Sequence, residues 1–138
     1  MNPRLVIPVI WALTGALLVK LLATWNRLPD RVAVHFGTTM QPNGWSSKTA
    51  LAAVVLVAVP GQAALATFLL LHVGSAATVP FAMVQLVVNV VLVSVFWQTI
   101  HYNVAGHMRP MWIFVPLIAV FAFAATFLVK LVFDVYRH

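Results

Sequence analysis

Four long apolar runs dominate this 138-residue chain and constrain its fold more than any other feature. A bilayer core about 30 Å thick requires about 20 apolar residues of α-helix, because each residue adds about 1.5 Å. Each of the four runs has that length. We therefore expect an all-α integral membrane protein in which four transmembrane helices form one antiparallel bundle, a single domain over residues 1–138. The predicted spans are residues 5–25, 49–73, 79–100 and 111–133.

Composition and charge exclude most other classes of protein. Hydrophobic residues make up 63% of the chain and charged residues 7%, whereas a soluble domain has about 25% charged residues. The net charge is +6, but most of the cations flank apolar runs, so we expect them to contact lipid phosphates and not nucleic acid. The chain has no Cys and two carboxylates, Asp30 and Asp134. This scarcity disfavours paired-acid catalysis and thiolate or carboxylate metal centres, so we expect no enzyme activity, cofactor or metal.

Three of the amide side chains in the two middle spans are candidates for a shared contact. Gln62 lies at the middle of the second span and Asn89 at the middle of the third, and a short connection makes these two spans a helical hairpin. Gln85 is one helical turn from Asn89 and shares its face. We expect Gln62 and Asn89 to pair at equal depth inside the bundle. Two interpretations remain open: hydrogen bonding that holds the helices together, and a polar lining for a small ligand.

Three histidines are predicted to lie on one side of the membrane, His35 in the first loop and His101 and His107 at the third. Their spacing is unlike any compact metal-ligand motif, and neighbouring cations would repel a metal ion. We therefore predict no metal site. His35 is expected to hydrogen-bond loop backbone or lipid phosphate.

The loop of residues 26–48, between the first two spans, has a sequence character of its own. Residues 32–36 alternate apolar Val or Phe with other residues, which predicts a short extended segment with one apolar face. Residues 41–44, Gln-Pro-Asn-Gly, have the composition of a tight turn. Ser46 or Ser47 is placed to cap the helix that follows. A loop with so many structural signals is expected to be ordered.

The same loop carries a motif that resembles a known family. Its residues resemble the signature LPxxIPxHF...G...DGWxSK of a bacterial membrane domain of uncharacterised function, which occurs alone and at the N-terminus of SdpI-type immunity proteins. Two departures from the signature stand out: Met40 replaces the usual Gly, and Asn43 replaces the usual Asp. The residues that match are Leu28, Pro29, His35, Phe36, Gly44, Trp45, Ser47 and Lys48.

This resemblance implies a multi-pass protein of the bacterial inner membrane with no known catalysis. In some relatives the family is linked to protection against a secreted peptide toxin and to membrane-based signalling. We predict a noncatalytic membrane protein that recognises a peptide, a lipid or a membrane partner through the first loop, with the eight matching residues as binding candidates. Two alternatives remain open: a small accessory subunit of a larger membrane complex, and a small-molecule transporter that would use Gln62, Gln85 and Asn89.

Overall fold

The computed structural model describes residues 5–72, 78–108, 118 and 122, and the account that follows concerns these residues. The predicted fourth span, residues 111–133, lies almost entirely outside them. The elements, in chain order, are helix α1 (Val6–Thr24), the short 3-10 helix η2 (Trp25–Arg27), strands β1 (Arg31–Phe36) and β2 (Pro42–Ser47), and helices α2 (Lys48–His72) and α3 (Thr78–Ala105).

Three helices are long and apolar enough to cross a membrane, by length and composition. They correspond to the first three predicted spans, and α3 continues to Ala105, beyond the predicted end at Ile100. Hydropathy marks the edge of the hydrocarbon region, but the polar residues that follow Ile100 still form helix. The three segments are Val6–Arg27, Lys48–His72 and Pro80–Ala105.

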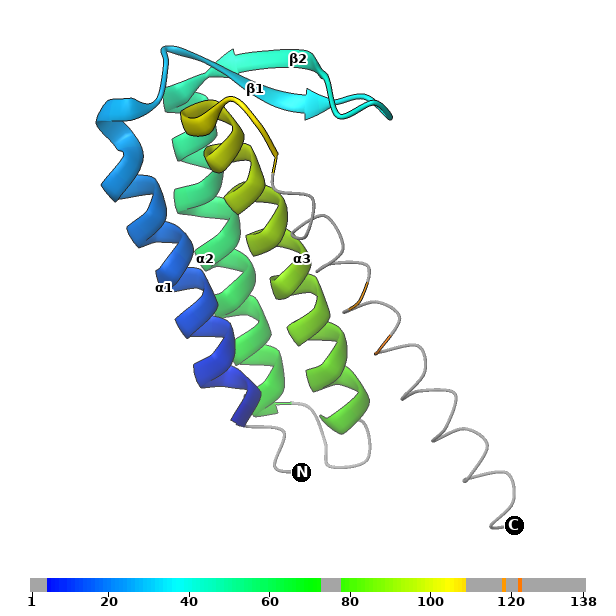
Figure 1. Cartoon of the computed structure of the whole chain (residues 1–138). Coiled ribbons are helices and arrows are strands. Elements are labelled where there is room, and N and C mark those ends of the chain that lie inside the picture. The colour runs from blue at the N-terminus through cyan, green and yellow to red at the C-terminus, as the bar shows by residue number, and fades with distance from the viewer. Residues whose placement is uncertain (1–4, 73–77, 109–117, 119–121, 123–138) are drawn as a thin grey trace.

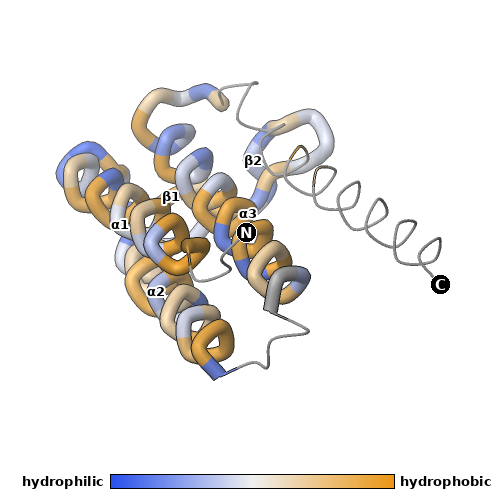
Figure 2. Tube along the Cα trace, turned by 90° about the horizontal axis from the view of Figure 1, so that it is seen from below, coloured by the Kyte–Doolittle hydropathy of each residue, from blue (hydrophilic) through white to orange (hydrophobic). Residues whose placement is uncertain are grey.

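The three helices pack against one another in all three pairs (Figure 1). Ala63 and Ala66 of α2 are fully buried, and such small side chains let helices approach closely in a membrane. Apolar residues make up much of the three helices (Figure 2). Some of them lie on the outside, where Val19, Leu22 and Val57 are each more than 60% exposed. Large apolar side chains on the outside suit a hydrocarbon solvent and would be costly in water.

The first loop forms a two-stranded antiparallel sheet, which we call the hairpin (residues 31–47). The predicted all-α class is therefore wrong at the first loop, which forms a sheet, although the described chain is mostly helical. The hairpin lies across one end of the helices, where α1 ends and α2 begins (Figure 1). The predicted extended segment is confirmed as β1, and the expectation that the loop is ordered holds.

The predicted turn at residues 41–44 is wrong, because Pro42 already opens β2. The chain instead reverses between Gly37 and Gln41. The Met40 N–H donates to the Gly37 carbonyl, and the Gly37 N–H donates to the Gln41 carbonyl, both at 2.9 Å. Met40 has φ of 59°, in the left-handed region. This is the geometry of a three-residue hairpin loop, in which glycine is the usual residue at the left-handed position.

Candidate functional site: the hairpin and its supports

An amide from α3 holds the outer edge of β1. The Ala33 N–H donates to Oδ1 of Asn103 at 2.7 Å, and Nδ2 of Asn103 donates to the Ala33 carbonyl at 2.9 Å. In an antiparallel pair, residues that bond to the partner strand alternate with residues that do not. The Lys48 N–H donates to the Asp30 carbonyl, so residues 30 and 48 form a bonded pair. The backbone groups of Ala33, three residues later, therefore point away from β2. Asn103 therefore occupies the place of a third strand at this residue.

The apolar face of β1 differs from the predicted alternation. Val32 and Ala33 are both fully buried, although they are neighbours in a strand. A bulge interrupts the pairing between Ala33 and His35, so that Val34 has no direct partner on β2. The sequence pattern gave no signal for Asn103, because it lies beyond the predicted end of the third span.

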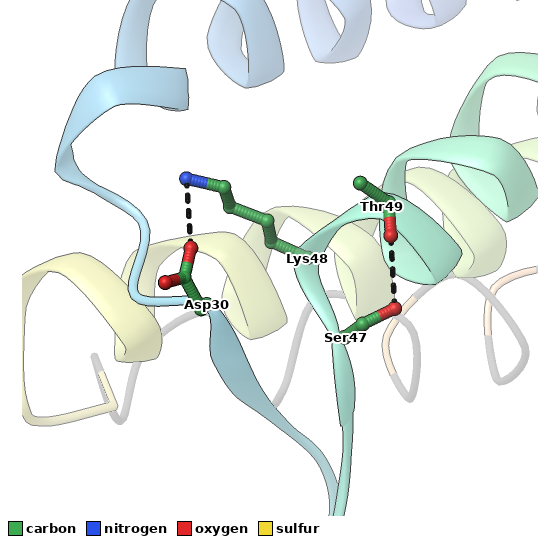
Figure 3. Close-up of polar contacts among 4 residues, drawn as sticks. All are labelled: Asp30, Ser47, Lys48 and Thr49. Carbon is green, nitrogen blue, oxygen red and sulfur yellow. Dashed lines mark hydrogen bonds and ion pairs between the residues drawn. The ribbon is translucent and has the colours of Figure 1, made fainter.

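Lys48 joins the two ends of the loop (Figure 3). Its Nζ lies 3.3 Å from Oδ1 of Asp30 and 5.3 Å from the centroid of the Trp25 ring. The first turn of α2 is capped by Ser47, one of the two predicted capping residues. The Ala50 N–H donates to Oγ of Ser47 at 3.1 Å. The Lys48 ammonium is thus engaged within the chain and holds the start of α2 against the end of α1.

The matching residues of the loop divide into supporting and exposed groups. Leu28 is 4% exposed and belongs to the core cluster beneath the hairpin. Phe36 is half-buried, and its ring meets the Tyr102 ring of α3 edge-to-face at 4.9 Å. His35 and Trp45 are exposed, Trp45 by 52%. Of the remaining matching residues, Ser47 and Lys48 support the fold, Gly44 pairs with His35, and Pro29 is exposed.

Gly44 gives the His35 side chain its position. A Cβ at residue 44 would lie 2.8 Å from Cδ2 of His35 and 2.9 Å from its Cβ. Both distances are shorter than real Cβ contacts, so any larger residue at 44 would displace the imidazole or bend β2. Two matching residues are therefore coupled by direct contact across the strands.

A cavity of about 260 Å³ lies beneath the hairpin, between α2 and α3. Apolar side chains of the two helices form most of its wall. The polar side chains in the wall belong to His35, Ser46 and Thr99. The exposed His35 thus faces both the hairpin surface and this cavity.

The predicted contact between the middle spans is confirmed. Nδ2 of Asn89 donates to Oε1 of Gln62 at 3.1 Å, and Nε2 of Gln62 donates to Oε1 of Gln85 at 3.2 Å. Nδ2 of Asn89 also donates to Oγ1 of Thr14 on α1 at 3.2 Å, so the cluster joins three helices. Thr14 was missed, because one threonine in an apolar helix gives no sequence signal. A ligand-binding role for these residues stays a prediction.

Other polar side chains of the described residues contact aromatic rings within the chain. Nζ of Lys20 lies 5.2 Å from the centroid of the Trp97 ring on α3. The rings of His101 and His107 meet at 5.4 Å. Within the described part of the chain, no three His, Cys, Asp or Glu side chains come close enough to hold a metal ion.

Residues 7–59 match the family described as a domain of unknown function, DUF1648. This segment contains most of α1, the whole hairpin and the first half of α2. The comparisons with curated proteins and with solved structures give no match. The matched segment therefore contains the hairpin and parts of the two helices that flank it.

Proposed function

We propose that this chain is a noncatalytic bacterial inner-membrane protein with four spans in an antiparallel bundle, which recognises a peptide, a lipid or a membrane partner through the hairpin. The motif of the first loop, which resembles that of SdpI-type immunity proteins, supports a role in self-protection or signalling. The observation that carries the proposal is a hairpin whose strand β1 is held by two hydrogen bonds to Asn103, with His35 and Trp45 exposed.

The first loop is longer and more ordered than a connection between two helices requires. A connection between two helix ends needs only a few residues, typically 2–8. Here a two-stranded sheet spans residues 31–47, and side chains from α2 and α3 immobilise it. Loops held by a rigid scaffold are where binding residues concentrate. An exposed Trp on such a loop is the kind of side chain that dominates binding energy at interfaces.

The test replaces His35 and Trp45 by Ala, one at a time. Cross-linking in native membranes measures partner binding, and survival of expressing cells against secreted peptide toxins measures protection. We expect binding or protection to fall at least about tenfold, while the free energy of unfolding changes by less than about 0.5 kcal/mol. The matched control is His72→Ala, an exposed histidine at the far end of α2. Loss of activity that always follows loss of folded protein would make the hairpin a scaffold and overturn the proposal.

The polar cluster in the spans favours a second candidate, a small-molecule transporter. Oδ1 of Asn89 is buried and accepts no hydrogen bond from the described residues, so it could accept one from a ligand. Gln62→Leu and Gln85→Leu variants that fold normally but lose all activity, with hairpin variants unaffected, would favour this candidate. Stoichiometric co-purification with a larger complex in mild detergent would favour an accessory subunit instead.

A further inference from the structure

We infer that the cavity beneath the hairpin binds one acyl chain of a bilayer phospholipid, with His35 and Ser46 as hydrogen-bond donors to the lipid ester or phosphate oxygens. This inference rests on the proposed function, because it selects a lipid among the partners that the hairpin would recognise. Three features of the cavity support it: its size, the exposure of its apolar wall, and the order of polar and apolar groups in that wall.

The cavity has the size of part of a lipid. Its volume of about 260 Å³ is just below the range of about 300–1,000 Å³ for pockets that enclose a drug-sized ligand. Leu51 of α2 and Phe96 of α3 belong to its apolar wall. A segment of one acyl chain fits this space, whereas a whole phospholipid does not.

The apolar end of the cavity lies among the spans, where two of its wall residues are exposed. Val54 of α2 and Val95 of α3 both line it, and they are 47% and 51% exposed. Both residues belong to helices that are long and apolar enough to cross a membrane, so their exposed surfaces meet hydrocarbon. A ligand that enters between them comes from the bilayer, which favours a lipid over a water-soluble peptide.

The polar end of the cavity lies at the hairpin. Oγ1 of Thr99 already donates to the Val95 carbonyl at 2.9 Å, so its proton is engaged. The His35 ring and the Ser46 hydroxyl, both from the hairpin, can donate to a ligand. Ester and phosphate oxygens of phospholipids are acceptors, and they lie at the level where the spans end. The cavity therefore has polar groups at the hairpin and apolar groups among the spans, as a phospholipid has polar oxygens followed by an acyl chain.

Gly44 acts as a positioning residue for this site. Because a Cβ at residue 44 would come within 2.8 Å of the His35 ring, Gly44→Ala displaces the donor without touching the apolar wall. We expect this variant to weaken retention of the lipid headgroup while leaving the acyl-chain space open.

The test uses the full chain purified in mild detergent from membranes of phosphatidylethanolamine and phosphatidylglycerol. Native mass spectrometry counts the phospholipid molecules that each chain retains. We expect one retained phospholipid in the parent, about tenfold lower occupancy in Val54→Phe, which fills the apolar end of the cavity, and no change in Val57→Phe. Val57 is a matched control, because it lies on the same helix and is 72% exposed but does not line the cavity. His35→Ala and Gly44→Ala should each lower occupancy several-fold.

A second measurement locates the bound lipid. Phosphatidylethanolamine with a diazirine in its acyl chain is added to delipidated protein, irradiated, and mapped by mass spectrometry. Cross-links at Val54, Val95 or Phe96 support the inference. It is overturned if the parent retains no lipid, if it retains a free fatty acid instead, or if Val54→Phe and Val57→Phe lower occupancy equally.

These outcomes separate the inference from the proposed function. If Trp45→Ala abolishes partner binding but the parent retains no lipid, the inference fails and the proposed function stands. If Val54→Phe releases the lipid while His35→Ala and Trp45→Ala keep full partner binding and protection, the proposed function fails and the lipid site stands.

Discussion

Asn103 near the end of α3 and Asn89 in its middle carry the same amide group, yet they serve different regions of the molecule. Asn103 bonds to both backbone groups of Ala33 and thereby fixes the hairpin. Asn89 bonds to the side chains of Gln62 and Thr14, on the two other helices. The first amide fixes an element on which His35 and Trp45 remain exposed. The second joins a cluster whose polar atoms mostly satisfy one another, so the hairpin is the region better suited to recognition.

The largest effect is expected when Asn103 is changed to Ala. Two backbone groups of Ala33 then lose their partners in a site that is already shielded from water. Each such loss costs about 1–3 kcal/mol, so we expect the hairpin to lose about 3 kcal/mol of local stability. Hydrogen exchange at the Ala33 amide measures this directly and should become about a hundredfold faster.

Asn26→Ala is the control for this change, because Asn26 is an exposed amide on η2. It should leave the exchange of Ala33 unchanged. Exchange that stays slow in Asn103→Ala would show that the strand pairing alone holds β1, and the contrast between the two amides would disappear.

The next effect concerns the cluster inside the bundle. Changing Gln62 or Asn89 to Leu removes a hydrogen bond between helices, and we expect each change to lower the free energy of unfolding by up to about 2 kcal/mol. The double variant should lose less than the sum of the two, because both changes break the same bond. Denaturation of the detergent-solubilised protein measures the free energy of unfolding of the parent, the two single variants and the double variant. Strictly additive losses would show that the two amides do not interact.

Much of the fold could be predicted from the sequence, because hydropathy and helix geometry act over long stretches. The contact between Gln62 and Asn89 followed from their equal depth on two helices joined by a short connection. The position of the hairpin turn did not follow, because the residue in the left-handed conformation is Met40 and not a glycine. Proline at residue 42 suggested a turn, but it is equally compatible with the first position of a strand.

The supports of the hairpin were also hidden from the sequence. Asn103 lies 70 residues along the chain from Ala33, and only the tertiary fold brings an amide to that edge. The loop motif was visible, but its division into supporting and exposed residues required distances. Lys48 was expected to reach a lipid phosphate or a partner, whereas the structure places it against Asp30 and Trp25.

A smaller effect is expected from Lys48→Met, which keeps the aliphatic stem and removes the charge. The ion pair is weak, because the Asp30 side chain is 95% exposed and such pairs contribute about 0–1 kcal/mol. The contact with the Trp25 ring adds about 0.5–1 kcal/mol. We expect a loss of about 1 kcal/mol that shrinks at high salt, measured by thermal unfolding. Arg27→Met, an exposed cation at the end of η2, should change stability less at every salt concentration.

The smallest effect has the opposite sign and comes from Met40→Gly. A left-handed conformation costs a residue with a Cβ about 1–2 kcal/mol, and glycine removes that cost. Glycine also lowers the free energy of unfolding by about 0.5–1 kcal/mol, because its unfolded chain has more conformational entropy. We therefore expect the hairpin to gain about 0.5–1 kcal/mol, seen as slower amide exchange at Gly37 and Gln41.

Thr39→Gly is the matched control, because Thr39 lies in the same turn without a positive φ, and it should destabilise the hairpin. If both glycine variants destabilise the hairpin, strain at Met40 is not relieved by glycine and the proposed loop geometry is wrong. If Met40→Gly stabilises the hairpin and partner binding is unchanged, the turn serves as scaffold, and recognition lies at His35 and Trp45 on the strands.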